Sequence, residues 1–151
     1  MAKQFVTFLM SDELYGIDIF NTQEIIRLPD LTPIPNSLEY VEGIINLRGN
    51  IIPVINLEKK FHMVSGMKNK REIIIIRAFN SLLGIIVNKV FRVIQVEESE
   101  IAQPPSILSG IEEEYIKGVT RIDDNSKVVI LLDIEKMFFE EEVKNLQKMG
   151  G

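Results

Sequence analysis

The sequence predicts an all-β fold of two similar small barrels, followed by a short C-terminal helix. Three observations predict it: short runs of β-branched residues bounded by turn residues, recurrence of that pattern along the chain, and one amphipathic helical pattern at the end. A chain of 151 residues can bury enough surface to be stable without a disulfide or a structural metal ion.

The two halves of the chain resemble each other. Aligning Gly16 with Gly84 (84 − 16 = 68 residues apart) brings Leu14, Tyr15 and Ile17 opposite residues of the same apolar kind. Residues 43–61 then match residues 118–138, with a few extra residues in the loop near residue 124. Glycine, proline, glycine and an acidic-lysine-x-phenylalanine ending recur in one order, which favours duplication over chance alignment of β-rich stretches.

The duplication predicts two subdomains, residues 1–70 and residues 71–151, the second including the helix. The N-terminal strand pairs either within its own barrel or with the second one, and the sequence leaves both alternatives open.

Two hairpins are expected in the first half. Strands at residues 5–10 and 15–19 flank a polar turn, and strands at residues 44–47 and 51–55 flank a turn in which Gly49 can take a positive φ. Because Pro53 has no N–H to donate, we expect its strand to lie at a sheet edge or a bulge.

The second half repeats this pattern and ends in a helix. Its strands are expected at residues 73–78, 84–87, 90–96, 116–120 and 127–132. The helix is expected to begin near Asp133, a good N-cap, and to end at the two terminal glycines. An apolar face of Phe139, Val143, Leu146 and Met149 either packs on a barrel, which we expect, or binds a partner.

Composition excludes several classes of function. There are 17 basic and 22 acidic residues, a net charge of −5, whereas nucleic-acid binding needs a basic surplus. The longest apolar runs, residues 73–76 and 128–132, are far shorter than the ~20 residues that span a bilayer. We therefore expect a cytoplasmic protein with no nucleic-acid partner and no direct membrane insertion.

Catalytic and metal-binding patterns are lacking in the sequence. Cysteine is absent and His62 is the single histidine, so thiolate chemistry and a multi-histidine metal site are excluded. No serine stands in a Gly-x-Ser-x-Gly context, and no nucleotide-binding glycine motif occurs. We expect no catalytic residue, no metal and no cofactor.

Two features suggest a binding surface instead. Arg48, in the turn after an apolar strand, either solubilises the turn, forms an internal ion pair with Glu24 or Glu42, or faces a partner. The proline-rich segment of residues 28–35 carries Leu28, Leu31 and Ile34, which form either a lid on the core or an exposed docking patch.

The motif around Asn46-Leu47-Arg48-Gly49 resembles the signature of the CheW family of bacterial chemotaxis adaptors. Nearly the whole chain shares the resemblance, in order and at the usual length of the single-domain members. The matching segments are residues 13–19, 23–25, 41–57, 84–87 and 130–136.

This resemblance implies two SH3-like five-stranded barrels and a non-catalytic adaptor with two partners. One is the cytoplasmic signalling tip of methyl-accepting chemotaxis receptors, bound between the barrels; the other is the regulatory domain of the histidine kinase CheA. The adaptor is expected to be monomeric when free and to form rings with the kinase in membrane receptor arrays, to which it is recruited from the cytoplasm.

The resemblance also implies site residues, carried over position by position. The receptor-facing positions are Thr22, Glu24, Gly43, Arg48, Gly84, Val90 and Val93. Thr22 stands where relatives often have an aliphatic residue. The kinase-facing positions are Leu14, Leu28, Leu31 and Ile34. The alternative class is a small-ligand-binding β-barrel that uses the cleft between the halves, with an enzyme as the third possibility.

Overall fold

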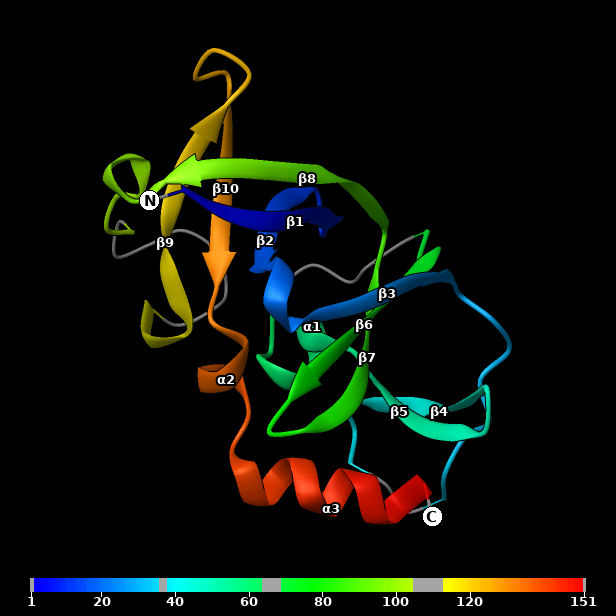
Figure 1. Ribbon diagram of the computed structural model, residues 1–151. Helices are drawn as coiled ribbons and strands as arrows, with labels where there is room; N and C mark the ends of the chain where they lie inside the picture. The colour runs from blue at the N-terminus through cyan, green and yellow to red at the C-terminus, as the bar shows by residue number, and fades with distance from the viewer. Residues whose placement is uncertain (1, 36–37, 64–68, 105–112, 151) are drawn as a thin grey trace.

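The computed structural model describes residues 2–35, 38–63, 69–104 and 113–150, and its strands form two five-stranded mixed sheets (Figure 1). Sheet A has the strand order β8-β1-β2-β10-β9, and sheet B has the order β3-β6-β7-β5-β4. The predicted mostly-β fold of two five-stranded halves with a short C-terminal helix is confirmed.

Sheet A draws its strands from both ends of the chain. They are β1 (Ala2–Met10), β2 (Glu13–Asp18), β8 (Lys89–Glu97), β9 (Ile116–Ile122) and β10 (Lys127–Leu132). The short 3₁₀ helices are η1 (Ile19–Asn21), η2 (Glu98–Glu100) and η3 (Glu113–Tyr115).

Sheet B is built from one continuous stretch of chain. Its strands are β3 (Thr22–Arg27), β4 (Val41–Leu47), β5 (Asn50–Ile55), β6 (Glu72–Ala78) and β7 (Ser81–Val87). The α-helices are α1 (Leu57–Lys60), α2 (Ile134–Met137) and α3 (Glu140–Gly150). In Figure 1, α3 runs along the end of sheet B, where it contacts β5 and β7.

The sheets divide the chain differently from the expected boundary after residue 70. The β1–β2 hairpin pairs with β8 and β10 in sheet A, while β6 and β7 pair with β3 and β5 in sheet B. Of the two alternatives for the N-terminal strand, the structure therefore has the crossed one. Each half thus contributes one hairpin to the other sheet, and we call this arrangement the strand exchange. A parallel β2–β10 contact joins the exchanged hairpin in sheet A, and a parallel β5–β7 contact joins it in sheet B.

The internal duplication extends to irregular details. The two strand orders coincide when β1 to β5 are matched with β6, β7, β8, β9 and β10. The β1–β8 register skips Phe91 and the β3–β6 register skips Gln23, so equivalent strands carry equivalent β-bulges. The β4–β5 and β9–β10 registers likewise skip Glu42 and Lys117.

Of the two expectations for Pro53, the sheet edge is wrong, because β5 pairs with β4 on one side and with β7 on the other, whereas a β-bulge does occur in β4 at Glu42, close to Pro53's partner Ile44. Opposite Pro53 in β4 is Ile44, whose N–H and C=O bond to Thr32 instead, with N···O distances of 2.9 and 3.1 Å. The pairing with β7 begins only at Val54. The ladder thus requires no donor from Pro53.

The expected C-terminal helix is broken into two. Asp133 caps α2 as predicted, its side chain accepting from the Lys136 N–H, but Phe138 has an extended backbone (φ −130°, ψ 143°) and ends the helix. In α3, Val143 and Leu146 are fully buried, whereas Phe139 is 77% exposed and does not join their face. The side chain of Met149 lies outside the described residues.

One hydrophobic core joins the two sheets. Phe8 and Tyr15 of sheet A pack in the same cluster as Ile74 and Ile85 of sheet B, and Leu146 of α3 closes it. A smaller cluster within sheet A contains Phe5, Ile94, Val96, Val129 and Leu131. Among the described residues, no helix is both long enough and apolar enough to cross a membrane.

Candidate partner-binding surfaces

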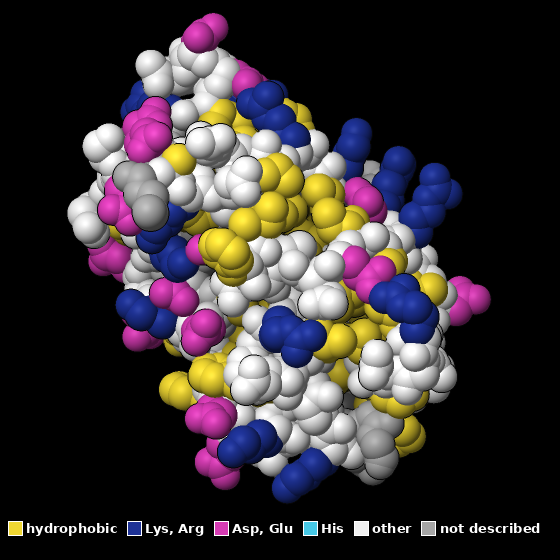
Figure 2. Space-filling view, in the orientation of Figure 1, with side chains coloured by type: hydrophobic (Ala, Val, Ile, Leu, Met, Phe, Trp, Pro, Cys, Tyr) yellow, Lys and Arg dark blue, Asp and Glu magenta, His cyan; other side chains and the backbone are white. Residues whose placement is uncertain are grey.

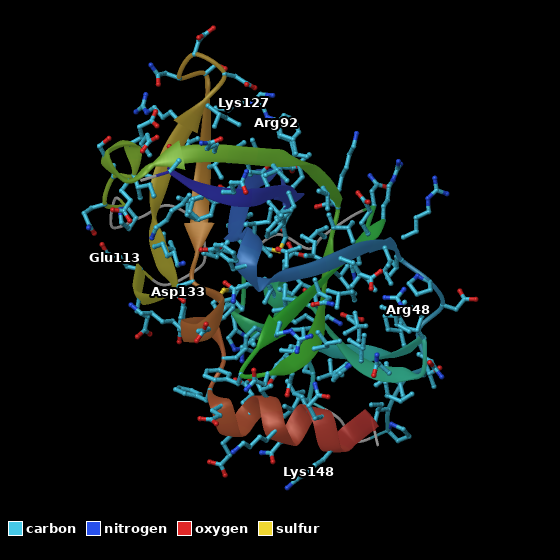
Figure 3. All side chains as sticks on the ribbon, in the orientation of Figure 1. Arg48, Arg92, Glu113, Lys127, Asp133 and Lys148 are labelled. Carbon is cyan, nitrogen blue, oxygen red and sulfur yellow. The ribbon has the colours of Figure 1, made fainter. Side chains whose placement is uncertain are left out.

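The turn between β4 and β5 presents Arg48 at the edge of sheet B. Arg48 and Gly49 have φ values of 52° and 88°, the left-handed pair that a two-residue hairpin turn requires. Asn46 Oδ1 accepts a 3.0 Å hydrogen bond from the Gly49 N–H and fixes the turn. The turn therefore holds Arg48 at the edge of the sheet, beside β3 (Figure 3).

Arg48 forms an ion pair with Glu24 of β3, one of the alternatives that the sequence left open. The other candidate, Glu42, instead pairs with Lys59 at 2.9 Å and accepts a hydrogen bond from Asn56. Burial alone would raise the pKa of Glu42, but these two donors outweigh it and lower the pKa. Because the Arg48 side chain stays 69% exposed, its unused N–H donors remain accessible to a partner.

Thr22 begins the same strand, one bulge residue before Glu24. It is half-buried, and its hydroxyl donates a 3.4 Å hydrogen bond to the Asp18 carbonyl. Next to it in the chain, η1 holds Phe20 with 91% of its surface exposed. No sequence pattern indicated this exposure, because an aromatic residue after a strand is equally typical of a buried core position.

The bulge in β8 places Val90 and Val93 on one face. Val90 lies opposite Phe8 and Val93 lies opposite Val6, two residues apart on β1, so both valines face the same way. Val90 is half-buried, and its N–H donates to Glu72 Oε1 at 2.8 Å; Val93 is 50% exposed. Figure 2 shows hydrophobic side chains gathered over this part of β8 and β1.

Gly43 and Gly84 are buried and act through the backbone. A Cβ on Gly43 would lie 2.7 Å from the Thr32 carbonyl oxygen, and Gly43 has a φ of 151°. A Cβ on Gly84 would lie 2.9 Å from a methyl carbon of Ile73. Both positions need glycine for close packing, so neither offers a side chain to a partner.

The four positions that the resemblance assigns to a kinase contact are distributed over two places. Leu28 and Leu31, in the segment after β3, are half-buried against the main core and cover it as a lid. Hydrogen bonds between Thr32 and Ile44 hold this segment on β4, and Ile34 in the same segment is half-buried. Leu14 lies in sheet A, where it lines a separate hollow.

A half-buried polar cluster that the sequence did not indicate attaches α3 to α1 and to the turn before β4. Glu142 accepts hydrogen bonds from the Tyr40 hydroxyl and from Lys60, and from the Phe139 N–H at 3.1 Å. Lys60 also lies over the Tyr40 ring, 4.5 Å from its centroid. These residues are separated by up to 102 positions, so no local pattern could have found them.

The cluster shifts the pKa of two of its members. Burial raises the pKa of Tyr40, and the neighbouring Glu142 carboxylate raises it further. Burial alone would also raise the pKa of Glu142, but hydrogen bonds from Lys60, Tyr40 and the Phe139 N–H outweigh it and lower the pKa. Glu142 is therefore held as a carboxylate that joins three elements.

The described residues present no group of three or more His, Cys, Asp or Glu side chains that could hold a metal ion. His62 is exposed at the end of α1, in a hollow that it shares with Lys60, Tyr115 and Phe139.

Comparison with known proteins gives consistent matches over nearly the whole chain. The family model described as the CheW-like domain matches residues 4–142. A relative named chemotaxis protein CheW, from Treponema pallidum (strain Nichols), is 42% identical, the alignment covering 97% of this chain and 88% of the relative. The protein of the same name from Klebsiella aerogenes is 31% identical, with 95% and 86% covered.

A solved structure agrees with these matches. The crystal structure of the scaffolding protein TtCheW from Thermoanaerobacter tengcongensis superposes with a TM-score of 0.80 at 38% identity, covering 92% of this chain and 89% of that one. The β1–β2 and β6–β7 hairpins, each of which pairs with strands of the other half, and the equivalent β-bulges therefore belong to a fold that is also found in a solved structure. The chain belongs to the CheW-like domain family.

Proposed function

We propose that this chain, a non-catalytic chemotaxis scaffold of the CheW type, couples the signalling tips of chemoreceptors to the histidine kinase CheA. The observation that carries the proposal is the family match over residues 4–142, which leaves only a few residues of the chain outside the adaptor domain. A scaffold of this kind raises the effective concentration of one partner near the other without chemistry of its own. It is expected to work in the cytoplasm at membrane receptor arrays.

The receptor face is proposed to combine the Glu24–Arg48 pair with the exposed side of β8. Arg48 supplies accessible donors, and Val93 supplies apolar surface that this chain leaves half uncovered. Thr22 and Val90 border these residues on the equivalent strands β3 and β8. Gly43 and Gly84 are proposed to support the face by fixing the backbone beneath it.

The kinase face is proposed to include Leu28, Leu31 and Ile34 on the lid segment, and Leu14 on sheet A. The lid leucines are only half-buried, so a partner can complete their burial without a rearrangement of the core. Rings with the kinase would require a further contact on the opposite half of the molecule, because a ring needs two different surfaces on each member.

Reconstitution with kinase and receptor fragments tests the proposal. Kinase activity measured with all three components should respond to the receptor fragment only when this protein is present. The Arg48→Glu variant should lose receptor binding while keeping kinase binding. Arg92→Glu is the matched control, because Arg92 forms the equivalent ion pair on sheet A with Asp123 and lies on the face of β8 opposite to Val93.

The kinase face is tested in the same assay with Leu31→Asp. We expect a weaker kinase complex with unchanged receptor binding, and the control is Leu38→Asp at an exposed leucine outside the proposed face. Thermal unfolding of each variant separates loss of an interface from loss of the fold. Equal loss of both partners by Arg48→Glu, together with a lower melting temperature, would make Arg48 a structural residue.

A further inference from the structure

Two hollows lie at equivalent positions in the two sheets. The hollow of sheet A has a volume of about 420 Å³, and the hollow of sheet B has a volume of about 500 Å³. Each lies between the tip of one hairpin and the start of a parallel-paired strand. Six residues of the sheet A hollow correspond by the repeat to six of the sheet B hollow: Leu9 to Arg77, Asp12 to Asn80, Glu13 to Ser81, Leu14 to Leu82, Lys127 to Asn50 and Val128 to Ile51.

In sheet B, the protein's own helix α3 covers this region. Gln147 of α3 forms part of the wall of the hollow, and its side-chain amide donates a 2.8 Å hydrogen bond to the Leu82 carbonyl. Val143 and Leu146, three residues apart on α3, are fully buried in the core beside it. The C-terminal half of the helix therefore lies at the tip of the β6–β7 hairpin.

The equivalent hollow of sheet A is lined entirely by strand and turn residues. It is also more apolar, since Leu9 replaces Arg77, and Phe91, on the bulge of β8, forms part of its wall. Val128 is 44% exposed and Phe91 is 37% exposed, which is unusual for two large apolar side chains on one small concave surface. This hollow therefore resembles the surface that α3 covers on sheet B, but no helix of the described residues contributes to its lining.

The charges at the rim of the two hollows differ as well. The β6–β7 tip is neutral, with Asn80 and Ser81, whereas the β1–β2 tip carries Asp12 and Glu13. A helix seated as α3 is on sheet B would bring its last turn to this acidic tip. Basic residues in the last turn would then interact favourably with both the carboxylates and the helix dipole.

We propose that the hollow of sheet A binds an amphipathic helix of a partner protein, in the position that α3 takes on sheet B. The partner helix presents two apolar side chains three or four residues apart to Leu14, Phe91 and Val128. Its last turn carries lysine or arginine next to Asp12 and Glu13. The proposal rests on the internal repeat, and it includes Leu14, which the proposed function places on the kinase face.

The probe for the test is a peptide of α3 itself, residues 139–148, closed into a helix by a hydrocarbon staple between positions 141 and 145. Both stapled positions are exposed in the protein, and the sequence supplies Val143 and Leu146 on one face with Lys144 and Lys148 toward the end. The staple removes most of the folding cost that would weaken so short a helix. Methyl NMR of the full-length protein reports where the peptide binds.

We expect the peptide to shift the methyl signals of Leu9, Leu14 and Val128. Val128→Asp should weaken peptide binding at least tenfold, while the equivalent substitution in sheet B, Ile51→Asp, should change it less than twofold. The double variant Asp12→Asn, Glu13→Gln should weaken binding about threefold by removing the acidic rim, in keeping with the modest worth of exposed charge pairs.

Three results would overturn the proposal. They are no shifts at peptide concentrations up to about 1 mM, shifts confined to sheet B residues such as Leu82, and equal loss of affinity in Val128→Asp and Ile51→Asp. Circular dichroism and thermal unfolding show whether each variant is folded. None of the substituted residues belongs to the proposed receptor or kinase faces, so failure here is distinguishable from failure of the coupling function.

Discussion

Sheet A and sheet B share one strand order but differ in the charges of their equivalent ion pairs and in whether helix α3 packs on them. In sheet B, Glu24 on the bulged strand β3 pairs with Arg48 in the β4–β5 turn. In sheet A, Arg92 on the equivalent strand β8 pairs with Asp123 in the β9–β10 turn, so the same ion pair recurs with its polarity reversed. The duplication thus preserved the position of the contact while exchanging which strand carries the positive charge.

The difference shows how one fold can offer two unlike surfaces. A partner that recognises a cation beside β5 on sheet B would meet an anion at the corresponding place on sheet A. Like-charge contacts are a strong means of rejecting a wrong surface. Helix α3, which packs on β5 and β7 of sheet B, adds a second asymmetry.

The largest effect is expected where the helix covers sheet B. Leu146→Ala removes a fully buried side chain from the main core and should lower the free energy of unfolding by about 3 kcal/mol. On the open sheet A, Val128→Ala should cost only about 0.5 kcal/mol, because the side chain is partly exposed. Urea unfolding followed by circular dichroism measures both, and equal losses would mean that α3 contributes no core of its own.

A smaller effect is expected at Gly43 of β4 and Gly118 of β9, which occupy equivalent positions in the two halves. Gly43→Ala places a Cβ against Thr32 O, and Gly118→Ala places one against Ala102 O, each at 2.7 Å. Each substitution should lower the free energy of unfolding by about 2 kcal/mol, through the displaced segment that bridges to the strand. Chemical denaturation of the two variants should give similar losses; a loss at one glycine alone would show that the halves are not equivalent in packing.

The Glu142 cluster should make stability depend on pH in the acid range. Because the folded-state pKa of Glu142 is lowered from 4.5, its contribution is present above about pH 4.5 and is lost as pH falls through the folded pKa. Glu142→Gln should cost about 1 kcal/mol at pH 7. The loss of unfolding free energy caused by Glu142→Gln should shrink toward zero once the pH is below the folded-state pKa of Glu142.

The matched control for this pH dependence is Glu141→Gln, since Glu141 is the exposed neighbour on the same helix. Its unfolding free energy should follow that of the unmodified protein from pH 7 to pH 3. A Glu142→Gln variant whose deficit stays constant over this range would show that the carboxylate charge is not what holds α3.

The smallest effect is expected for the ion pairs themselves. Arg48→Glu and Glu24→Arg should each change the free energy of unfolding by about 0.5 kcal/mol, because Arg48 is largely exposed, and the double reversal should restore most of it. A double-mutant cycle in thermal unfolding measures the coupling. A coupling energy several times larger than about 0.5 kcal/mol would show that the main role of the ion pair is to stabilise the fold and not to bind a partner.

Much of this architecture was readable from local patterns. The hairpin turns at Asp12 and Gly49 and the N-cap at Asp133 follow from residue types at short spacing, and the duplication follows from alignment of one half with the other. The ion pair Glu24–Arg48 was one of the alternatives that the sequence left open. These features depend on neighbours in the chain, which sequence patterns report.

The remainder depends on contacts between distant residues. Nothing in the β1–β2 hairpin indicates that it pairs with β10 and not with β5, since either strand offers the same apolar edge. Pro53 is tolerated inside a sheet only because Thr32 takes the hydrogen bonds of Ile44. The break at Phe138 and the exposure of Phe20 are likewise decided by tertiary packing, which outweighs local propensity.

The strand exchange has a consequence for the order in which the protein can fold. All five strands of sheet B come from residues 22–87, so its sheet can assemble as soon as that stretch has left the ribosome. Sheet A must wait until β10 is available to close onto β2, more than a hundred residues earlier in the chain. Closing so long a loop is slow, and until it happens the N-terminal hairpin can pair with β8 but not with β10. The pairing of β2 with β10, which joins the two ends of the chain, is thus expected to form last.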